Sequence, residues 1–220
     1  PPPAAGATAS QAAGVTNFQT LRFDATAITQ DMAAFSATTF TKATQATGAG
    51  ASALTITNAS ASLNTLDVNQ AAAITTGFAR ASDTATDALT VNAIQAIAAT
   101  SALTASNEET VTINASTFAV DLDLATATDL TTLNLTGSGA AQAIVIDAQA
   151  ATLLATVNAS AISGTNTLNV DASDSTVALT FTGGTNSGAT AFTSGSGNDI
   201  INAGTASASV IDGGSGNDSI

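Results

Sequence analysis

The C-terminal stretch 194–220 places glycines and aspartates at a spacing that suits a hard cation. Residues 213–220 are Gly-Gly-Ser-Gly-Asn-Asp-Ser-Ile, and residues 194–202 are Ser-Gly-Ser-Gly-Asn-Asp-Ile-Ile-Asn. Both follow the nonapeptide pattern G-G-x-G-x-D-x-U-x, with Ser194 replacing the first glycine of the earlier copy. Glycine lets a loop wrap closely around an ion, and the Asp carboxylate supplies oxygens of the kind that Ca²⁺ prefers. The stretch therefore predicts calcium-binding turns.

The candidate metal residues are the glycines and the Asn-Asp pairs of the two copies, with one further aspartate. They are Gly195, Gly197, Asn198, Asp199, Asp212, Gly214, Gly216, Asn217 and Asp218. Asp199 and Asp218 are separated by the length of two nonapeptides and one additional residue, and two nonapeptides make one coil. We therefore expect them on the same side of neighbouring coils. In the intervening residues 203–212, Ala208 takes the position of the ligand Asp, so a full second site on the opposite side is in doubt.

A short phrase that alternates apolar and polar residues recurs along most of the chain. Its copies begin at residues 54, 66, 89, 111, 133, 144, 155, 168 and 179, which gives a unit of about 11 or a coil of about 22 residues. The alternation is typical of a strand with one buried face, and the Asn, Asp and small residues that follow favour turns. Such units bury their apolar faces only by stacking. The repeats predict an all-β fold, a right-handed parallel β-solenoid with a C-terminal calcium-binding β-roll.

The alternation also predicts which side chains face the core. We expect six to stack inward, namely Ile113, Leu135, Ile146, Val157, Val170 and Phe181. Their neighbours should face outward, namely Thr112, Asn134, Val145, Thr156, Asn169 and Thr180. Small and β-branched apolar residues suit a thin core between closely packed sheets.

The regularity of the repeats divides the chain into four expected segments. Residues 1–16 are expected to be a linker, and 17–88 an irregular segment of strands and loops in which residues 17–24 form a strand. Residues 89–193 are expected to form the parallel solenoid, and 194–220 the start of a longer β-roll. Because Ile220 falls inside a repeat, we expect both ends to be cuts in a longer polypeptide.

The charge balance excludes several classes of partner. The chain has sixteen acidic residues and only three basic ones, Arg22, Lys42 and Arg80, and no basic residue follows Arg80. Nucleic acids and anionic membranes both require Lys and Arg, and no apolar run is long enough to span a membrane. Without Cys or His, the chain lacks disulfides and the commonest general base. Glu108 and Glu109 are expected in a solvated loop, and no H-E-x-x-H or G-x-S-x-G motif occurs. We therefore do not expect an enzyme.

The Gly-Asp copies at 194–202 and 213–220 resemble RTX repeats, the calcium-binding β-roll of proteins that Gram-negative bacteria export by type I secretion. The Thr-, Ala- and Ser-rich repeats that precede them resemble Caulobacter-type surface-layer (S-layer) proteins. The resemblance implies a structural protein on the extracellular face of a bacterial cell, whose partners are further copies of itself in a lattice or outer-membrane polysaccharide. Two alternatives stay open. In the first, the segment forms the stalk of an RTX adhesin. In the second, it is the non-catalytic part of a secreted RTX enzyme.

Overall fold

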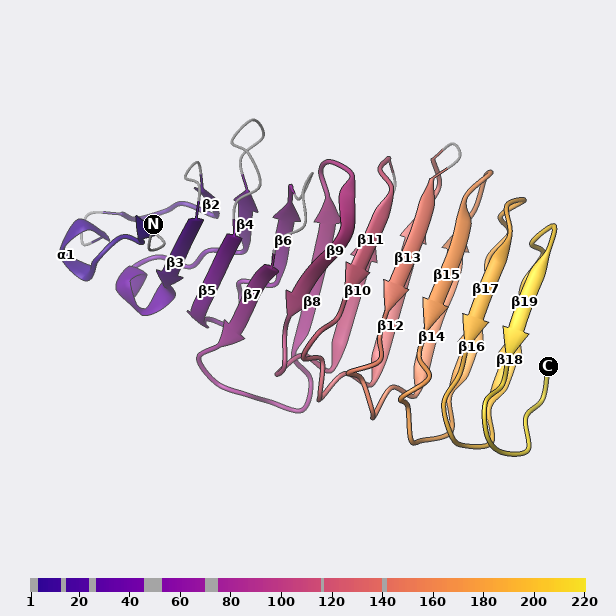
Figure 1. The fold of residues 1–220 in the computed structure, drawn as a ribbon. Coiled ribbons are helices and arrows are strands. Elements are labelled where there is room, and N and C mark those ends of the chain that lie inside the picture. Colours follow the sequence, from indigo (N-terminus) through magenta and orange to yellow (C-terminus); the bar gives the residue numbers. More distant parts are fainter. Residues whose placement is uncertain are drawn as a thin grey trace.

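A computed structural model of the chain describes residues 4–12, 15–23, 27–45, 53–69, 75–115, 117–139 and 142–220 (Figure 1). These residues form an all-β solenoid, in which the chain winds alternately through two parallel sheets along one long axis. The odd-numbered strands make one sheet, here called the odd sheet, and the even-numbered strands make the even sheet. Among the described residues, no helix has the length and apolar character needed to cross a membrane.

Each coil contributes one strand to each sheet. The odd sheet contains, in order, β1 (Ala4–Ala5), β3 (Ala27–Asp31), β5 (Ala53–Ala59), β7 (Thr75–Arg80), β9 (Ile97–Thr104), β11 (Val120–Asp123), β13 (Ala143–Asp147), β15 (Thr167–Asp171), β17 (Thr190–Thr193) and β19 (Ser209–Asp212). The even sheet contains β2 (Thr20–Phe23), β4 (Lys42–Gln45), β6 (Thr65–Val68), β8 (Ala88–Ala93), β10 (Thr110–Asn114), β12 (Thr132–Gly137), β14 (Thr156–Ile162), β16 (Thr180–Thr182) and β18 (Ile200–Asn202). The described helices are α1 (Ala9–Ala12) and the short 3-10 helix η1 (Met32–Phe35).

The register between neighbouring strands matches the repeat length of the sequence. Val111 pairs with Leu133, and Leu133 pairs with Val157, so that successive partners stand about one predicted coil apart in the chain. The predicted coil length and the parallel solenoid are therefore confirmed. Within each strand the buried residues alternate with outward ones, as the pattern of β10 illustrates with Val111 and Ile113 buried.

The six side chains predicted to point inward are all buried, each at most 1% exposed. They do not form a single stack, however. Ile113 lies beside Leu135, and Val157 beside Phe181, in two columns of the even sheet. Ile146 and Val170 form a third column in the odd sheet. The single stack was the wrong geometry, because consecutive sequence repeats alternate between two sheets and cannot all share one column.

The outer faces and the core width also follow the pattern. Of the side chains predicted to face outward, Asn169 and Thr180 are exposed and the other four are half-buried. Inside, the rings of Phe181 and Phe192 stack across the two sheets with centroids 4.1 Å apart and planes 11° apart. One layer of side chains from each sheet thus fills the core, which suits the small apolar residues of this sequence.

Both sheets continue through the part of the chain expected to be irregular. Strands β2 to β7 pair in parallel in the same order as the later strands. β6, in the segment expected to be irregular, pairs directly with β8, where the regular solenoid was expected to begin. The strand expected at residues 17–24 is β2, although Asp24 lies outside the described residues. Within the expected linker, β1 pairs with β3, while residues 1–3 and 13–14 lie outside the described residues.

Candidate functional site

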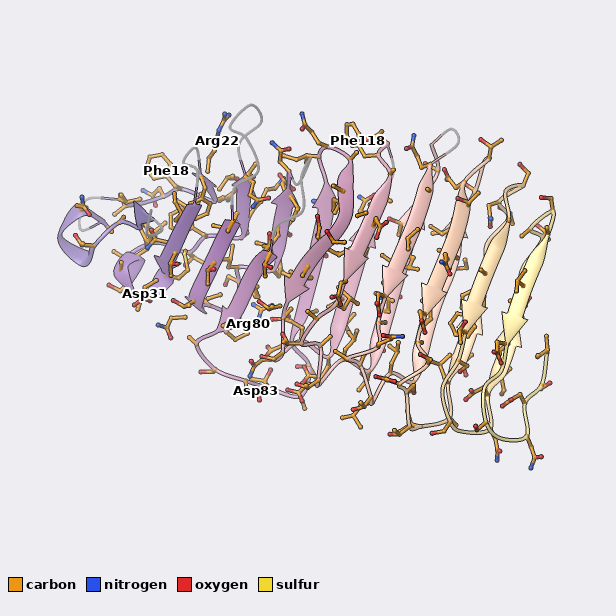
Figure 2. The ribbon with its side chains drawn as sticks, viewed as in Figure 1. Phe18, Arg22, Asp31, Arg80, Asp83 and Phe118 are labelled. Carbon is orange, nitrogen blue, oxygen red and sulfur yellow. The ribbon has the colours of Figure 1, made fainter. Side chains whose placement is uncertain are left out.

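The turns that follow the odd strands lie together along one long side of the solenoid (Figure 1). They connect the end of each odd strand to the next even strand, and the odd strands all run in the same direction. Figure 2 shows Arg80 and Asp83 on this side, with Arg22 and Phe118 on the opposite one. The fold thus collects short segments from the whole length of the sequence into one edge.

This edge gathers most of the acids of the chain. From β7 onward it carries nine exposed or half-buried carboxylates, here called the acidic edge: Asp83, Glu109, Asp123, Asp129, Asp147, Asp171, Asp174, Asp212 and Asp218. From β8 onward, the turns of the opposite side contain no Asp or Glu among the described residues. Two effects raise the pKa of Asp123 above its ordinary value. The larger is burial, and the second is repulsion from the like charge of Asp147 on the neighbouring coil.

Several of these aspartates also have a local structural role. Asp147, Asp171 and Asp212 are the last residues of their strands. The Oδ1 atom of each accepts a hydrogen bond from the backbone N–H two residues later, at 3.1, 3.0 and 2.9 Å. This is the side-chain contact by which Asp favours a turn. The remaining oxygen of Asp171 accepts a hydrogen bond from the side-chain amide of Gln149, so the partners of these carboxylates are neutral groups.

The two Gly-Asp loops lie directly above one another at the C-terminal part of this edge. Ser196 pairs with Ser215, and Ile200 pairs with Ser219, through isolated parallel bridges. The backbone N–H of Asp199 donates to Oδ1 of Asp218 at 3.1 Å. The prediction that Asp199 and Asp218 lie on the same side, one coil apart, is therefore confirmed. The apolar residue two positions after Asp199, Ile201, points into the core.

The predicted glycines allow the loops to approach so closely. Gly214 and Gly216 adopt φ angles of +73° and +141°, which disfavour residues with a side chain. A Cβ atom on Gly216 would lie 1.6 Å from the carbonyl oxygen of Gly197, and a Cβ on Gly195 would lie 2.1 Å from that of Ser175. Contact between coils therefore requires glycine at both positions.

The nine predicted metal residues lie in or directly beside the two stacked loops, with Asp212 at the end of β19. Asn198 and Asn217 stack, because the backbone N–H of Asn217 donates to Oδ1 of Asn198 at 2.9 Å. Asp212 ends β19 ahead of the second loop, and its Oδ1 accepts the hydrogen bond from Gly214. Asp212 thus shapes the entry to the loop, whereas Asp218 lies between the two loops.

The donor set has the chemistry that calcium prefers, since it consists of carboxylates, amide oxygens and backbone carbonyls. Among the described residues, no group of three or more Asp or Glu side chains is placed to hold a metal ion together. The carboxylate of Asp218 and the backbone carbonyls of the two loops are the groups that could hold such an ion. In this respect the donors fit a calcium ion with one or two carboxylates and no closed carboxylate cage.

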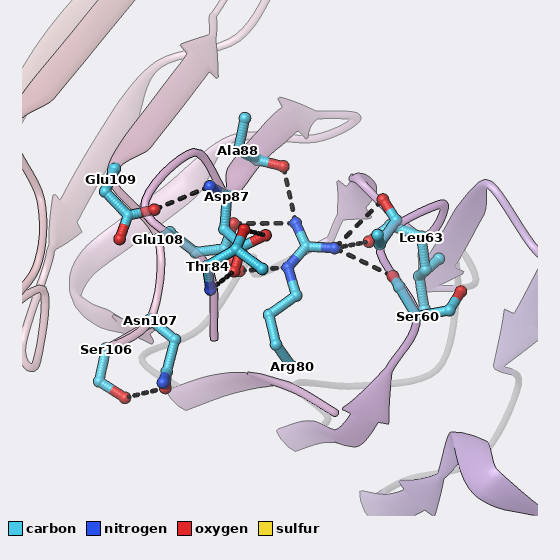
Figure 3. Close-up of polar contacts among 11 residues, drawn as sticks. Ser60, Leu63, Arg80, Thr84, Asp87, Ala88, Ser106, Asn107, Glu108 and Glu109 are labelled. Carbon is cyan, nitrogen blue, oxygen red and sulfur yellow. Dashed lines mark hydrogen bonds and ion pairs between the residues drawn. The ribbon is translucent and has the colours of Figure 1, made fainter. Parts of the chain in front are cut away.

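Glu108 does not lie in a solvated loop, which corrects the expectation from the sequence. Its carboxylate forms an ion pair with Arg80, at 2.7 Å from Nε and 2.9 Å from Nη2 (Figure 3). Both side chains are at most 2% exposed. Arg80 also donates to the carbonyls of Ser60, Leu63 and Ala88, which lie in or beside neighbouring turns of the same edge. Arg80 is therefore already engaged by buried partners and does not compensate the outer carboxylates.

Sequence reasoning missed two features of this site. Ser194, treated as a departure from the motif, donates its hydroxyl to Oδ2 of Asp199 at 2.5 Å. The acidic edge was also missed, although Asp123, Asp147 and Asp171 recur at a constant interval that is close to one coil. Combining that interval with the predicted period places these three aspartates in one column.

Comparisons of the chain with protein-family models, with curated proteins and with solved structures find no match. Its assignment therefore rests on its own geometry: a parallel β-solenoid with one acidic edge, in which two Gly-Asp loops lie one coil apart.

Proposed function

We propose that this chain is a structural segment of a calcium-dependent extracellular assembly on a bacterial surface, comparable to an RTX-containing S-layer protein. The observation that carries the proposal is the alignment of the acidic edge with the two stacked Gly-Asp loops. A single edge then offers calcium both a loop in which to bind and a row of uncompensated carboxylates. Secretion by the type I route and location on the cell surface are parts of the same proposal.

The electrostatics give a reason for calcium to control association. The chain has a formal net charge of −13, and the acidic edge concentrates much of it. Two such edges repel each other at low ionic strength, and the repulsion extends over roughly 10 Å at 0.1 M salt. Divalent ions held between carboxylates of two copies reverse the sign of this interaction, whereas monovalent salt only screens it. Assembly therefore requires calcium rather than ionic strength alone.

The test is sedimentation velocity of the purified chain across a calcium titration, with magnesium at equal concentration as the control. We expect monomers in chelator and in Mg²⁺, and larger species in Ca²⁺, because Mg²⁺ gives up its hydration water reluctantly. A variant with Asp147→Asn and Asp171→Asn should assemble less while keeping its β-sheet circular dichroism. On cells that carry the whole protein, chelation should release it into the medium.

The adhesin stalk is the alternative, and the same experiment separates the two. A rigid solenoid also serves as a spacer between an anchor and a binding domain. A chain that binds calcium yet stays monomeric at every calcium concentration would reject the assembly and favour the stalk. A chain that binds no calcium would reject both.

A further inference from the structure

The two Gly-Asp loops differ at one position that decides how their carboxylates are held. Five residues before its aspartate, the first loop has Ser194 and the second has Gly213. In the first loop, Oδ2 of Asp199 accepts a hydrogen bond from the Ser194 hydroxyl at 2.5 Å, and Oδ1 accepts one from the backbone N–H of Leu179 at 2.8 Å. Asp199 is only 1% exposed. Both of its carboxylate oxygens therefore have protein donors in a site closed to water.

The second loop repeats only half of this arrangement. Oδ1 of Asp218 accepts the backbone N–H of Asp199, one coil back, as Asp199 accepts that of Leu179. Oδ2 of Asp218 instead lies against Gly213, where a Cβ atom would be 2.5 Å away. Glycine has no hydroxyl to donate, so this oxygen lacks the donor that Ser194 supplies to Asp199. The second carboxylate therefore keeps an oxygen that can reach a cation.

We infer that Ser194 closes the first loop to calcium, so that the chain binds calcium through Asp218 while Asp199 acts as a metal-independent cap on the preceding coil. This inference rests on the calcium dependence proposed above and assigns its site. Calcium needs six to eight oxygens at about 2.3–2.6 Å. At Asp199 it would have to displace two charge-assisted hydrogen bonds inside a closed site. At Asp218 it meets an oxygen that has no hydrogen-bond donor from the described part of the chain.

The inference gives the residue before the first glycine of the Gly-x-Gly-Asn-Asp run a definite role. A serine there stabilises the loop without a metal, and a glycine there leaves the carboxylate to the metal. Ser194 and Gly213 occupy equivalent positions in the two loops. Exchanging the two residue types should therefore exchange the calcium-binding behaviour of the loops. Gly213 has no positive φ angle that opposes a side chain. A Cβ atom there lies 2.5 Å from Oδ2 of Asp218, so the Asp218 carboxylate must move to admit the serine.

The experiment is calcium titration of the full chain by isothermal titration calorimetry, with Tb³⁺ luminescence as a second readout. We expect the wild-type chain to bind one calcium per chain in the tighter class of sites, and Asp218→Asn to lose it. Asp199→Asn should keep it, because the amide Oδ1 still accepts the N–H of Leu179. Ser194→Gly should raise the stoichiometry to two, and Gly213→Ser should lower it towards zero. Far-UV circular dichroism verifies that each variant is folded.

A thermal measurement supports the titration and does not depend on counting sites. In chelator, Ser194→Gly should unfold at a lower temperature than the wild type, since Asp199 loses its hydroxyl donor. Calcium should reverse this loss of thermal stability. If Asp199→Asn abolishes calcium binding as fully as Asp218→Asn, or if Ser194→Gly leaves the stoichiometry at one, the inference is overturned and the calcium dependence stands. If the wild-type chain binds no calcium, both are overturned.

Discussion

Arg80 and Glu108 form a two-point ion pair that joins turns of successive coils while both side chains are almost fully withdrawn from solvent. Arg80 is the last residue of β7 and Glu108 follows β9, so the pair ties two neighbouring turns on the acidic edge. The guanidinium also lies 4.9 Å from the ring centroid of Phe78, and its remaining N–H groups reach backbone carbonyls. With so many donors satisfied at once, this arginine organises the centre of the edge.

Arg80→Met should therefore be strongly destabilising. It leaves the Glu108 carboxylate buried without a partner, and breaking a buried pair in this way costs about 3–5 kcal/mol of unfolding free energy. The double variant Arg80→Met with Glu108→Leu should recover much of that loss, because no buried charge then remains. Urea unfolding of the full chain measures both. A double variant as unstable as the single one would show that the carbonyl contacts of Arg80, not the ion pair, dominate.

The stability of the N-terminal coils should depend on pH through Asp67. Burial raises the pKa of Asp67, but hydrogen bonds from Asn92, Lys42 and Thr44, with the charge of Lys42, outweigh burial and hold the pKa below its ordinary value. A lowered folded-state pKa means that the contribution is complete above the unfolded value of about 3.9 and is lost as pH falls through the folded value.

The measurement is the unfolding midpoint of the wild type and of Asp67→Asn between about pH 2.5 and pH 7, a range that spans the carboxyl titration. The wild type should be more stable than the variant near neutral pH, and the difference should shrink towards the acid end. Asp83→Asn, at an exposed carboxylate of the acidic edge, is the matched control. A constant difference between wild type and Asp67→Asn across this range would contradict the assignment.

Adjacent residues on one strand should respond oppositely to a new charge. Val157 in β14 is fully buried between Leu133 and Phe181, whereas Thr156 faces outward. Val157→Asp places an unpaired carboxylate in the core and should prevent folding or destabilise it by several kcal/mol. Thr156→Asp should change stability by less than about 1 kcal/mol, as is usual for surface substitutions. Comparable losses in the two variants, measured by thermal unfolding, would overturn the inward and outward assignment.

Gly216 should tolerate no side chain. Its φ of +141° and the 1.6 Å approach of a Cβ atom to the Gly197 carbonyl both oppose Gly216→Ala. This change should separate the two loops and abolish calcium binding, whereas Ser215→Ala, next to it and exposed, should leave binding intact. Calcium titration and hydrogen exchange of residues 194–220 measure the outcome. Wild-type affinity in Gly216→Ala would mean that the loops need not be in contact to bind the ion.

The sequence by itself determined the class of fold and the position of the Gly-Asp loops. Alternation of apolar and polar residues fixes which face of a strand is buried, and a constant interval between strands requires stacking. These signals are local, so residues such as Ile113, Leu135 and Phe181 could be assigned to the core directly. The motif likewise placed Asp199 and Asp218 one coil apart, because their separation in the chain is about one period.

Only the tertiary structure decided what depends on contacts between coils. Glu108 was expected in solvent, because no residue near it in the sequence indicates a buried partner. Arg80 lies 28 residues earlier in the chain and contacts Glu108 from the neighbouring coil. Ser194 resembled a lost glycine, and only the folded shape of its own loop brings its hydroxyl to Oδ2 of Asp199. The N-terminal coils have less regular repeats, so their strands are specified by pairing with neighbours more than by local pattern. Sequence periodicity determines whether a side chain points into the core or outward. Which residue it contacts depends on the coil that packs against it.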